Sequence, residues 1–219
     1  MQIAFFLFPG ITALDAVGPY EVLQRLPGAE VVFVAAEPGP QRTDNGSLAL
    51  TADASIDDVT SPDIVVVPGG FGTRPLMDDE RVLSWVRTVH ETSTWTTSVC
   101  TGSLVLAAAG LLEGLEATTH WGQLPVLATY GATPTSRRVV EQGKIITSAG
   151  VSSGIDMALV LASRIGGDVL AQAIQLGIEY DPQPPFDAGS PDKAPPDVVD
   201  LVGSLMNAAW QAGAVPPTA

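Results

Sequence analysis

The chain has 219 residues, with 24 acidic against 10 basic side chains and a formal net charge of −14. This excess of negative charge repels both a phosphate backbone and an anionic lipid surface, so we expect no nucleic-acid partner and no membrane partner. Hydrophobic residues make up 46% and charged residues 16%, a balance that excludes a disordered chain and predicts a single folded domain over residues 1–219.

The sequence contains a single cysteine, Cys100, which excludes an internal disulfide. The apolar stretch that follows Met1 is short and lacks the basic start of a secretory signal peptide. The apolar run after Cys100 is about half the length needed to span a bilayer. We therefore expect a cytoplasmic protein without a transmembrane segment.

The first hundred residues contain four short apolar runs that predict strands buried on both faces. These runs lie at residues 2–8, 30–36, 63–70 and 95–100. Helical patterns at about 15–26, 80–91 and 101–109 alternate with them or follow them, and Asn45-Gly46 indicates a turn. The alternation predicts an α/β fold with a mostly parallel sheet and helices on both faces.

The second half of the chain predicts three more strands and three more helices. The strands are expected at 116–121, 137–143 and 144–150, the last two forming a hairpin that makes one sheet edge mixed. The helices are expected at 153–165, 168–179 and 197–212. The proline-rich segment 181–197 is expected to be a loop or linker, and residues 214–219 to be frayed.

Cys100 lies where a β-branched run gives way to a helix-forming one, in the segment SVCTGS. Loops that leave the carboxyl ends of parallel strands meet at one sheet edge, which brings segments 9–15, 68–75 and 100–102 together. A nucleophile on a tight strand-to-helix turn projects from that edge, and a helix N-terminus favours a thiolate with a lowered pKa. Free cysteines are also often buried as small hydrophobic side chains, so a packing role remains open.

Other residues at this edge have two interpretations each. Gly69 and Gly70 could expose backbone N–H groups to a developing negative charge, or form a simple tight turn. Asp15 could cap the helix that follows it, or offer a carboxylate for proton transfer.

Three aromatic or imidazole side chains are also candidates. His120 could activate a thiol or lie half-buried in a strand. Trp121 could line a pocket or belong to the core. His90 is expected on a solvent-facing side of its helix.

Several of these segments together resemble the ThiJ/PfpI superfamily, in which a glutamine-amidotransferase-like (flavodoxin-like) α/β fold carries the nucleophile on a strand-to-helix elbow. The matching segments are residues 8–23, 66–72, 97–114, 117–121, 154–159 and 179–192, and they cover nearly the whole chain. The cysteine segment and the proline-rich loop are the specific parts, whereas doubled glycines are widespread. Within the superfamily the chain resembles the branch that hydrates isonitriles.

The resemblance implies that Cys100 is the nucleophile and Asp15 the carboxylate beside it. Gly70 and Thr101 are then expected to line the substrate or oxyanion pocket, together with Gly69, Trp121 and Val151. Peptidase-like members carry a histidine directly after the nucleophile, whereas this sequence has Thr101, which argues against proteolysis. Other members have a glutamate where this chain has Asp15, and the shorter side chain agrees with the hydratase branch.

The implied activity is a hydro-lyase that converts an isonitrile to an N-substituted formamide. It would form a thioimidate on Cys100, with Asp15 as general acid and base and with no metal or organic cofactor. Homodimers are usual for the resembled family, so a homodimer is expected. The alternatives are a redox or ligand sensor that works through oxidation of Cys100, and a glyoxalase-like or deglycase-like enzyme.

Some regulators of transcription join a related domain to a helix-turn-helix half and share part of these motifs. The present sequence ends at Ala219 without such a half, and its acidic balance opposes DNA binding. We therefore expect the enzymatic branch rather than a regulator.

Overall fold

A computed structural model describes residues 1–212 of the chain. Its main sheet has seven strands, and adjacent strands are parallel except at one edge. In spatial order the strands are β10 (Val139–Gln142), β11 (Ile145–Ser148), β7 (Trp95–Val99), β6 (Ile64–Val67), β1 (Gln2–Phe6), β2 (Glu30–Ala35) and β5 (Ala54–Ser55). The antiparallel pair is β10–β11, so the predicted mixed edge and its hairpin are confirmed.

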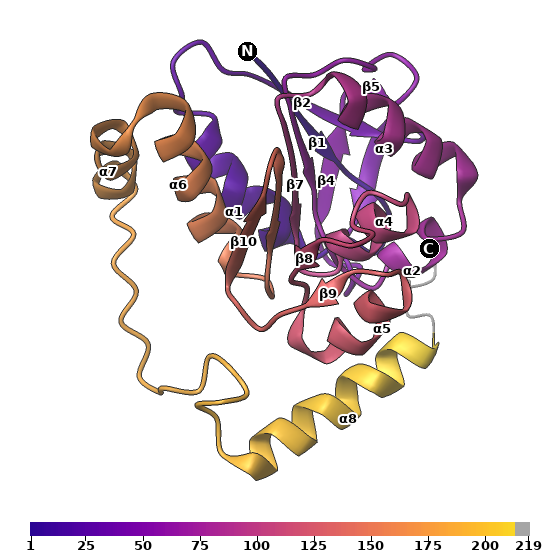
Figure 1. The fold of residues 1–219 in the computed structure, drawn as a ribbon, viewed down its shortest axis with the longest axis vertical. Coiled ribbons are helices and arrows are strands. Elements are labelled where there is room, and N and C mark those ends of the chain that lie inside the picture. Colours follow the sequence, from indigo (N-terminus) through magenta and orange to yellow (C-terminus); the bar gives the residue numbers. More distant parts are fainter. Residues whose placement is uncertain (213–219) are drawn as a thin grey trace.

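Helices cover both faces of this sheet, as the alternating pattern predicted (Figure 1). One face carries α1 (Ala13–Leu23), α6 (Ser153–Gly166) and α7 (Asp168–Gly177). The other carries α2 (Thr73–Leu76), α3 (Glu80–Thr92), α4 (Gly102–Ala108) and α5 (Leu124–Thr129). Residues 214–219, predicted to be frayed, lie outside the described residues, and the single domain over residues 1–219 stays a prediction.

The central strand β1 shows why the sheet strands are continuous apolar runs. Successive side chains of a strand point to opposite faces, and both faces of this sheet are covered. Ile3 and Phe5 pack into the core under α1, α6 and α7, whereas Ala4 and Phe6 pack into the core on the other side. All four side chains are fully buried.

The strand predicted at 116–121 is wrong beyond its first two residues. Only β8 (Glu116–Ala117) is a strand, and it pairs with β9 (Thr133–Pro134) in a separate small sheet. The next residues bond to side chains and loops: Thr118 N donates to Thr147 Oγ1 at 3.0 Å, and Thr119 Oγ1 donates to the carbonyl oxygen of Cys100 at 2.9 Å. These bonds hold the chain beside the end of β7, and the 3₁₀ turn η1 (Trp121–Gln123) follows.

A second hairpin, β3 (Gly39–Arg42) with β4 (Ala49–Ala52), was not predicted from the sequence. Its strands are short and mix glycine, proline and polar residues, so they lack an apolar pattern. The predicted Asn45-Gly46 turn is confirmed as its connection, since Gly46 N donates to Thr43 O at 2.9 Å. This hairpin brings the turn next to the first loop, where Ile11 forms a bridge to Thr43.

The proline-rich segment is a loop, as predicted, and residues 181–195 contain no helix or strand. Figure 1 shows it as an extended arm that leaves α7 and ends at α8 (Pro196–Ala212), which is drawn below α5 in this view. Helix α8 packs against η1, where Gly203 lies close to the Trp121 ring. Among residues 1–212, no helix is both long and apolar enough to cross a membrane.

Helix α4 starts so close to β6 that its first residue has no room for a side chain. A Cβ at Gly102 would lie 2.0 Å from the carbonyl oxygen of Val67 and 2.7 Å from that of Pro68. Both neighbours are backbone atoms, which a rotamer change cannot move away. Gly102 therefore sets the approach of the Cys100 turn to the neighbouring strand.

We predict that Gly102→Ala lowers the free energy of unfolding by more than about 2 kcal/mol, because overpacking against backbone forces the turn to shift. Urea unfolding followed by circular dichroism measures the loss. Gly177→Ala is the matched control, since a Cβ there meets nothing within 4 Å and should change stability by less than about 1 kcal/mol. Equal effects of the two substitutions would contradict the close-packing argument.

Candidate active site

Cys100 occupies a strained backbone position between β7 and α4. Its φ angle is +55°, in the left-handed region that residues other than glycine rarely adopt. Its backbone N–H is held by the carbonyl oxygens of Ser148 at 3.1 Å and Ala149 at 2.9 Å. The side chain is only 5% exposed. The predicted strand-to-helix turn is confirmed, and the neighbouring loop after β11 fixes its conformation.

Asp15 does not cap α1, so the capping interpretation is wrong. The N-cap residue is Thr12, and Asp15 lies in the first turn with its carboxyl group fully buried. Its Oδ2 accepts a hydrogen bond from Gly69 N at 3.0 Å. Its Oδ1 has no hydrogen-bond partner among the described residues, although it is buried. A buried carboxyl oxygen without a partner is costly, which indicates a role beyond packing.

The burial of Asp15 raises its pKa to about 8. The hydrogen bond from Gly69 and the interaction with the Cys100 thiol lower the pKa, and the nearby charge of Asp44 raises it. Desolvation outweighs the two favourable contacts because a carboxylate loses its hydration when it is buried. Asp15 therefore retains a proton at neutral pH and is suited to donate it.

The thiol of Cys100 does not have the lowered pKa expected at a helix N-terminus. Burial raises the pKa of this thiol well above its usual value, and the Asp15 charge raises it further. The backbone N–H groups of Thr101 and Val151 act in the opposite direction. Asp15 and Cys100 thus form a buried pair in which the pKa of both groups is raised. When the pair loses one proton, the carboxyl group and the sulfur share the proton that remains.

The three predicted loops converge around this pair. Thr12 N donates to Gly69 O at 2.9 Å, and Gly70 N and Thr101 Oγ1 form a reciprocal pair of hydrogen bonds at 2.9 and 3.1 Å. A Cβ at Gly69 would lie 2.8 Å from Asp15 Oδ2, so only glycine fits there. The N–H groups of Gly69 and Gly70 are both engaged, which opposes the oxyanion role expected of them.

The Cys100 side chain opens onto a cavity of about 290 Å³. Of the residues expected around it, the structure brings Cys100, Gly70, Thr101 and Val151 to the cavity wall, with Asp15 and Gly69 directly behind. Six further wall residues were missed by the sequence analysis: Thr12, Asp44, Phe71, Gln123, Met206 and Trp210. Thr12 and Phe71 lie on two of the loops that were predicted to converge with Cys100. The other four come from the β3–β4 turn, η1 and α8, and no local pattern in the sequence links these segments to Cys100.

His120 also lies on the wall of this cavity, outside any strand. Its Nδ1 accepts a hydrogen bond from Gly122 N at 3.2 Å, and its ring packs against Gly150, where a Cβ would lie 2.9 Å from Cδ2. Burial lowers the pKa of His120, so the ring is neutral at neutral pH. A lowered pKa makes the ring a weak base and its Nδ1 is already engaged, so the arrangement fits packing better than thiol activation.

Two aromatic or imidazole predictions need correction. Trp121 does not line the Cys100 cavity but two neighbouring ones, because η1 turns the indole ring toward α8. His90 does not face solvent freely: it is half-buried, and its Nδ1 pairs with Thr96 Oγ1 at 2.9 Å. Neither residue contributes to the candidate site.

The site combines a buried thiol, a carboxyl group that keeps its proton and a small, mainly apolar cavity. This arrangement is suited to nucleophilic addition with proton transfer to a small substrate. Within residues 1–212, no group of three or more histidine, cysteine, aspartate or glutamate side chains is placed to bind a metal ion.

Comparison with known proteins places this geometry in a family. The isonitrile hydratase of Pseudomonas putida is 48% identical over 200 residues, which cover 91% of this chain and 87% of that protein. A crystal structure of a ThiJ/PfpI family protein from Pseudomonas syringae superposes with a TM-score of 0.92 and 37% identity, covering 97% of this chain and 88% of the other.

The regulator CdhR of Pseudomonas aeruginosa, an HTH-type transcriptional regulator, is 31% identical over 76% of this chain, which spans 51% of the regulator's length. The DJ-1/PfpI family model matches residues 1–164. The superfamily resemblance inferred from the motifs is thus confirmed, and the chain belongs to the DJ-1/PfpI family.

Proposed function

We propose that this protein is a cysteine-dependent hydro-lyase that adds water to isonitriles and releases N-substituted formamides. The similarity to the Pseudomonas putida isonitrile hydratase over most of both chains supports this reaction. The observation that carries it is the buried Asp15 carboxyl group beside Cys100, with a raised pKa and with Oδ1 unpartnered within residues 1–212. Addition across an isonitrile carbon needs a nucleophile and a proton donor at the same atom, and this pair supplies both.

In the first step the Cys100 thiolate attacks the terminal carbon of R–N≡C, and the Asp15 proton is transferred to that carbon. A C–S bond and a C–H bond form, and the triple bond becomes the C=N double bond of a thioimidate. Asp15 is left as a carboxylate. Before attack the pair holds one proton, and its transfer from sulfur to the carboxylate produces the thiolate and the carboxyl group that react.

In the second step the Asp15 carboxylate takes a proton from water and passes it to the nitrogen, while the hydroxide adds to the thioimidate carbon. The C–S bond then breaks and the thiolate leaves, and the hydroxyl proton passes to Asp15 as the carbonyl group of the formamide forms. Asp15 ends with its proton restored. The sum of the steps is R–NC plus water giving R–NH–CHO, with no oxidant, reductant or metal ion needed.

In this proposal the other site residues do not exchange protons with the substrate; they stabilise the thiolate, shape the site or surround the substrate. The N–H groups of Thr101 and Val151 stabilise the thiolate, as their lowering effect on the Cys100 pKa supports. Gly69 and Gly70 allow the second loop to approach Asp15 and Thr101 closely. Apolar side chains such as Phe71, Met206 and Trp210 surround the R group of the substrate.

We expect Cys100→Ser to abolish hydration of an alkyl isonitrile while the fold is kept, because a serine hydroxyl supplies almost no alkoxide at neutral pH. Formamide formation and circular dichroism are measured on the same preparation. Activity within about tenfold of wild type would remove Cys100 from the nucleophile role. Absence of turnover in the wild-type protein would instead favour a sensor or a glyoxalase-like enzyme.

Asp15→Asn should lower turnover by about 10²- to 10⁴-fold, because asparagine can neither give a proton to the isonitrile carbon nor take one from water. The same substitution replaces the protonated carboxyl group by a neutral amide of nearly the same shape, so alkylation of Cys100 by iodoacetamide should be about as fast as in wild type. Turnover and alkylation rates of the folded variant are compared.

Asp44→Asn is the matched control, since it makes the same replacement of aspartate by asparagine at a residue on the wall of the Cys100 cavity. Its turnover should stay within about tenfold of wild type, because the Asp44 charge is the smallest of the influences on the Asp15 pKa. Equal losses in the two variants, or near-normal turnover in Asp15→Asn, would contradict the proton-transfer role.

We also propose that the protein is a homodimer in the cytoplasm. Two leucines of α8, Leu201 and Leu205, are 60% and 63% exposed, and Phe186 in the arm is 77% exposed. Apolar side chains in this arrangement are characteristic of a protein interface. A reducing compartment keeps a nucleophilic thiol from oxidation.

The double variant Leu201→Glu/Leu205→Glu should be monomeric if α8 lies in the dimer interface, because two buried carboxylates oppose association. Size-exclusion chromatography with light scattering gives the mass of each protein. Asn207→Glu is the control on an exposed position of the same helix and should remain dimeric. A monomeric wild-type protein, or a dimeric double variant, would contradict this assignment.

A further inference from the structure

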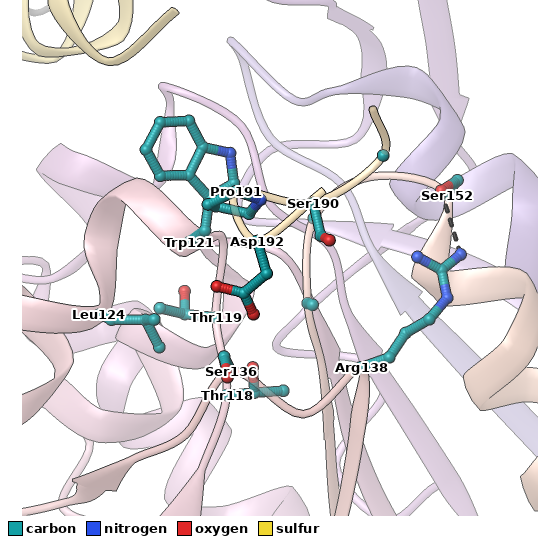
Figure 2. Close-up of a pocket in the computed structure, with 13 residues that line it drawn as sticks. Thr118, Thr119, Trp121, Leu124, Ser136, Arg138, Ser152, Ser190, Pro191 and Asp192 are labelled. Carbon is teal, nitrogen blue, oxygen red and sulfur yellow. Dashed lines mark hydrogen bonds between the residues drawn. The ribbon is translucent and has the colours of Figure 1, made fainter. Parts of the chain in front are cut away.

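A second cavity of about 420 Å³ lies next to the Cys100 cavity and is the larger of the two (Figure 2). Its volume falls in the range of about 300–1,000 Å³ that is typical of small-molecule sites. Its walls come from the chain on either side of η1, from the β10–β11 region and from the arm at residues 189–192. None of the proposed catalytic side chains lines it, so the proposed reaction leaves it without a role.

Only a thin partition separates the two cavities. His120 and Val151 line the Cys100 cavity, whereas their neighbours Thr119 and Gly150 line the second one. Thr119 donates to the carbonyl oxygen of Cys100, and Gly150 contacts the His120 ring. The second cavity is therefore a separate space whose wall is formed by residues in direct contact with the candidate active site.

The cavity contains one positive and one negative side chain. Arg138 is fixed by its Nη2 donating to Ser152 Oγ at 3.1 Å and by an ion pair with Asp156. A guanidinium group carries five N–H donors, so further donors remain. Asp192 is exposed and forms no ion pair within residues 1–212. In Figure 2 its carboxylate and the Arg138 guanidinium come from different sides of the cavity.

A buried hydroxyl group at the cavity has no partner. Thr118 is fully buried, and within residues 1–212 its Oγ1 forms no hydrogen bond. In Figure 2 Thr118 lies next to Ser136, on the same side of the cavity as the Asp192 carboxylate. An unsatisfied buried hydroxyl costs about 1–3 kcal/mol, so a polar ligand that bonds to it would recover part of that cost.

The remaining wall is apolar and aromatic. Trp121 and Leu124 are three residues apart in the chain, and both line the cavity. The Trp121 ring is held between the His120 ring, at a centroid distance of 5.5 Å, and helix α8 at Gly203. This wall is suited to an apolar side group of a ligand rather than to a second charge.

We propose that this cavity is a second small-molecule site that binds a free α-amino acid with an apolar side chain. The ammonium group would pair with Asp192, and the carboxylate with the free donors of Arg138 and with nearby hydroxyl groups. The side chain would lie against Trp121 and Leu124. The ligand's two charges complement the two charges of the cavity.

The charge balance favours this class over simpler ones. A phosphate or dicarboxylate would meet one arginine that is already paired with Asp156 and would also meet the unpaired Asp192. A plain amine would satisfy Asp192 but leave the Arg138 donors and the Thr118 hydroxyl without partners. Only a ligand with both charges and an apolar group uses every feature of the wall.

Isothermal titration of the full chain with L-leucine tests the proposal, and binding to Cys100→Ser should be unchanged because the site is separate. Leucine should bind at least about tenfold more tightly than 3-methylbutylamine, which lacks the carboxylate, or 4-methylpentanoate, which lacks the amine. Absence of binding by a panel of apolar L-amino acids, or equal binding of the amine alone, would overturn it.

Asp192→Asn should weaken leucine binding by about tenfold or more, whereas Asp187→Asn should not. The two aspartates belong to the same exposed arm, but Asp187 pairs with Lys193 and does not line the cavity. Thr118→Val should also weaken binding while leaving the melting temperature equal or higher, because it removes an unsatisfied hydroxyl. Unchanged affinity in both cavity variants would show that leucine binds elsewhere and would overturn the site.

Discussion

The hydrogen bond from Gly69 N to the buried carboxyl group of Asp15 is the contact on which the candidate site depends. It ties the first turn of α1 to the loop after β6 and holds the carboxyl group beside the Cys100 thiol. The bond exists only because position 69 is glycine, since a Cβ would lie within 3 Å of three atoms of the site. Burial then keeps the carboxyl group protonated, and the same burial raises the pKa of the neighbouring thiol.

Contacts from the surrounding structure stabilise the strained backbone of Cys100. Cys100 keeps a left-handed backbone angle because two carbonyl oxygens at the end of β11 hold its N–H, and because Gly102 allows α4 to start against β6. A parallel sheet gives such rigidity, since its strands are buried on both faces and their carboxyl ends meet at one edge. The reacting groups thus lie on loops whose ends are fixed by the core.

The arm and α8 cover the edge of the sheet at which the Cys100 loops meet. Met206 and Trp210 of α8 close the Cys100 cavity, while residues 189–192 of the arm form part of the neighbouring cavity. The arm has few contacts of its own and exposes apolar residues such as Phe186, so its position depends on α8 packing against Trp121. One segment of the chain therefore limits access to both cavities.

The sequence by itself determined the α/β class, the order of the main strands and helices, and the position of Cys100 on a strand-to-helix turn. These features follow from local apolar periodicity and from turn residues, which do not need distant contacts. It also placed Asp15, Gly70, Thr101 and Val151 near Cys100, through motifs that the family shares. The tertiary structure decided what local patterns do not encode. It showed that Asp15 faces the thiol instead of capping α1, that Trp121 turns toward α8, and that burial outweighs the helix N-terminus in setting the Cys100 pKa. Each of these outcomes depends on desolvation or on contacts between segments far apart in the chain, and so only the folded arrangement fixes it.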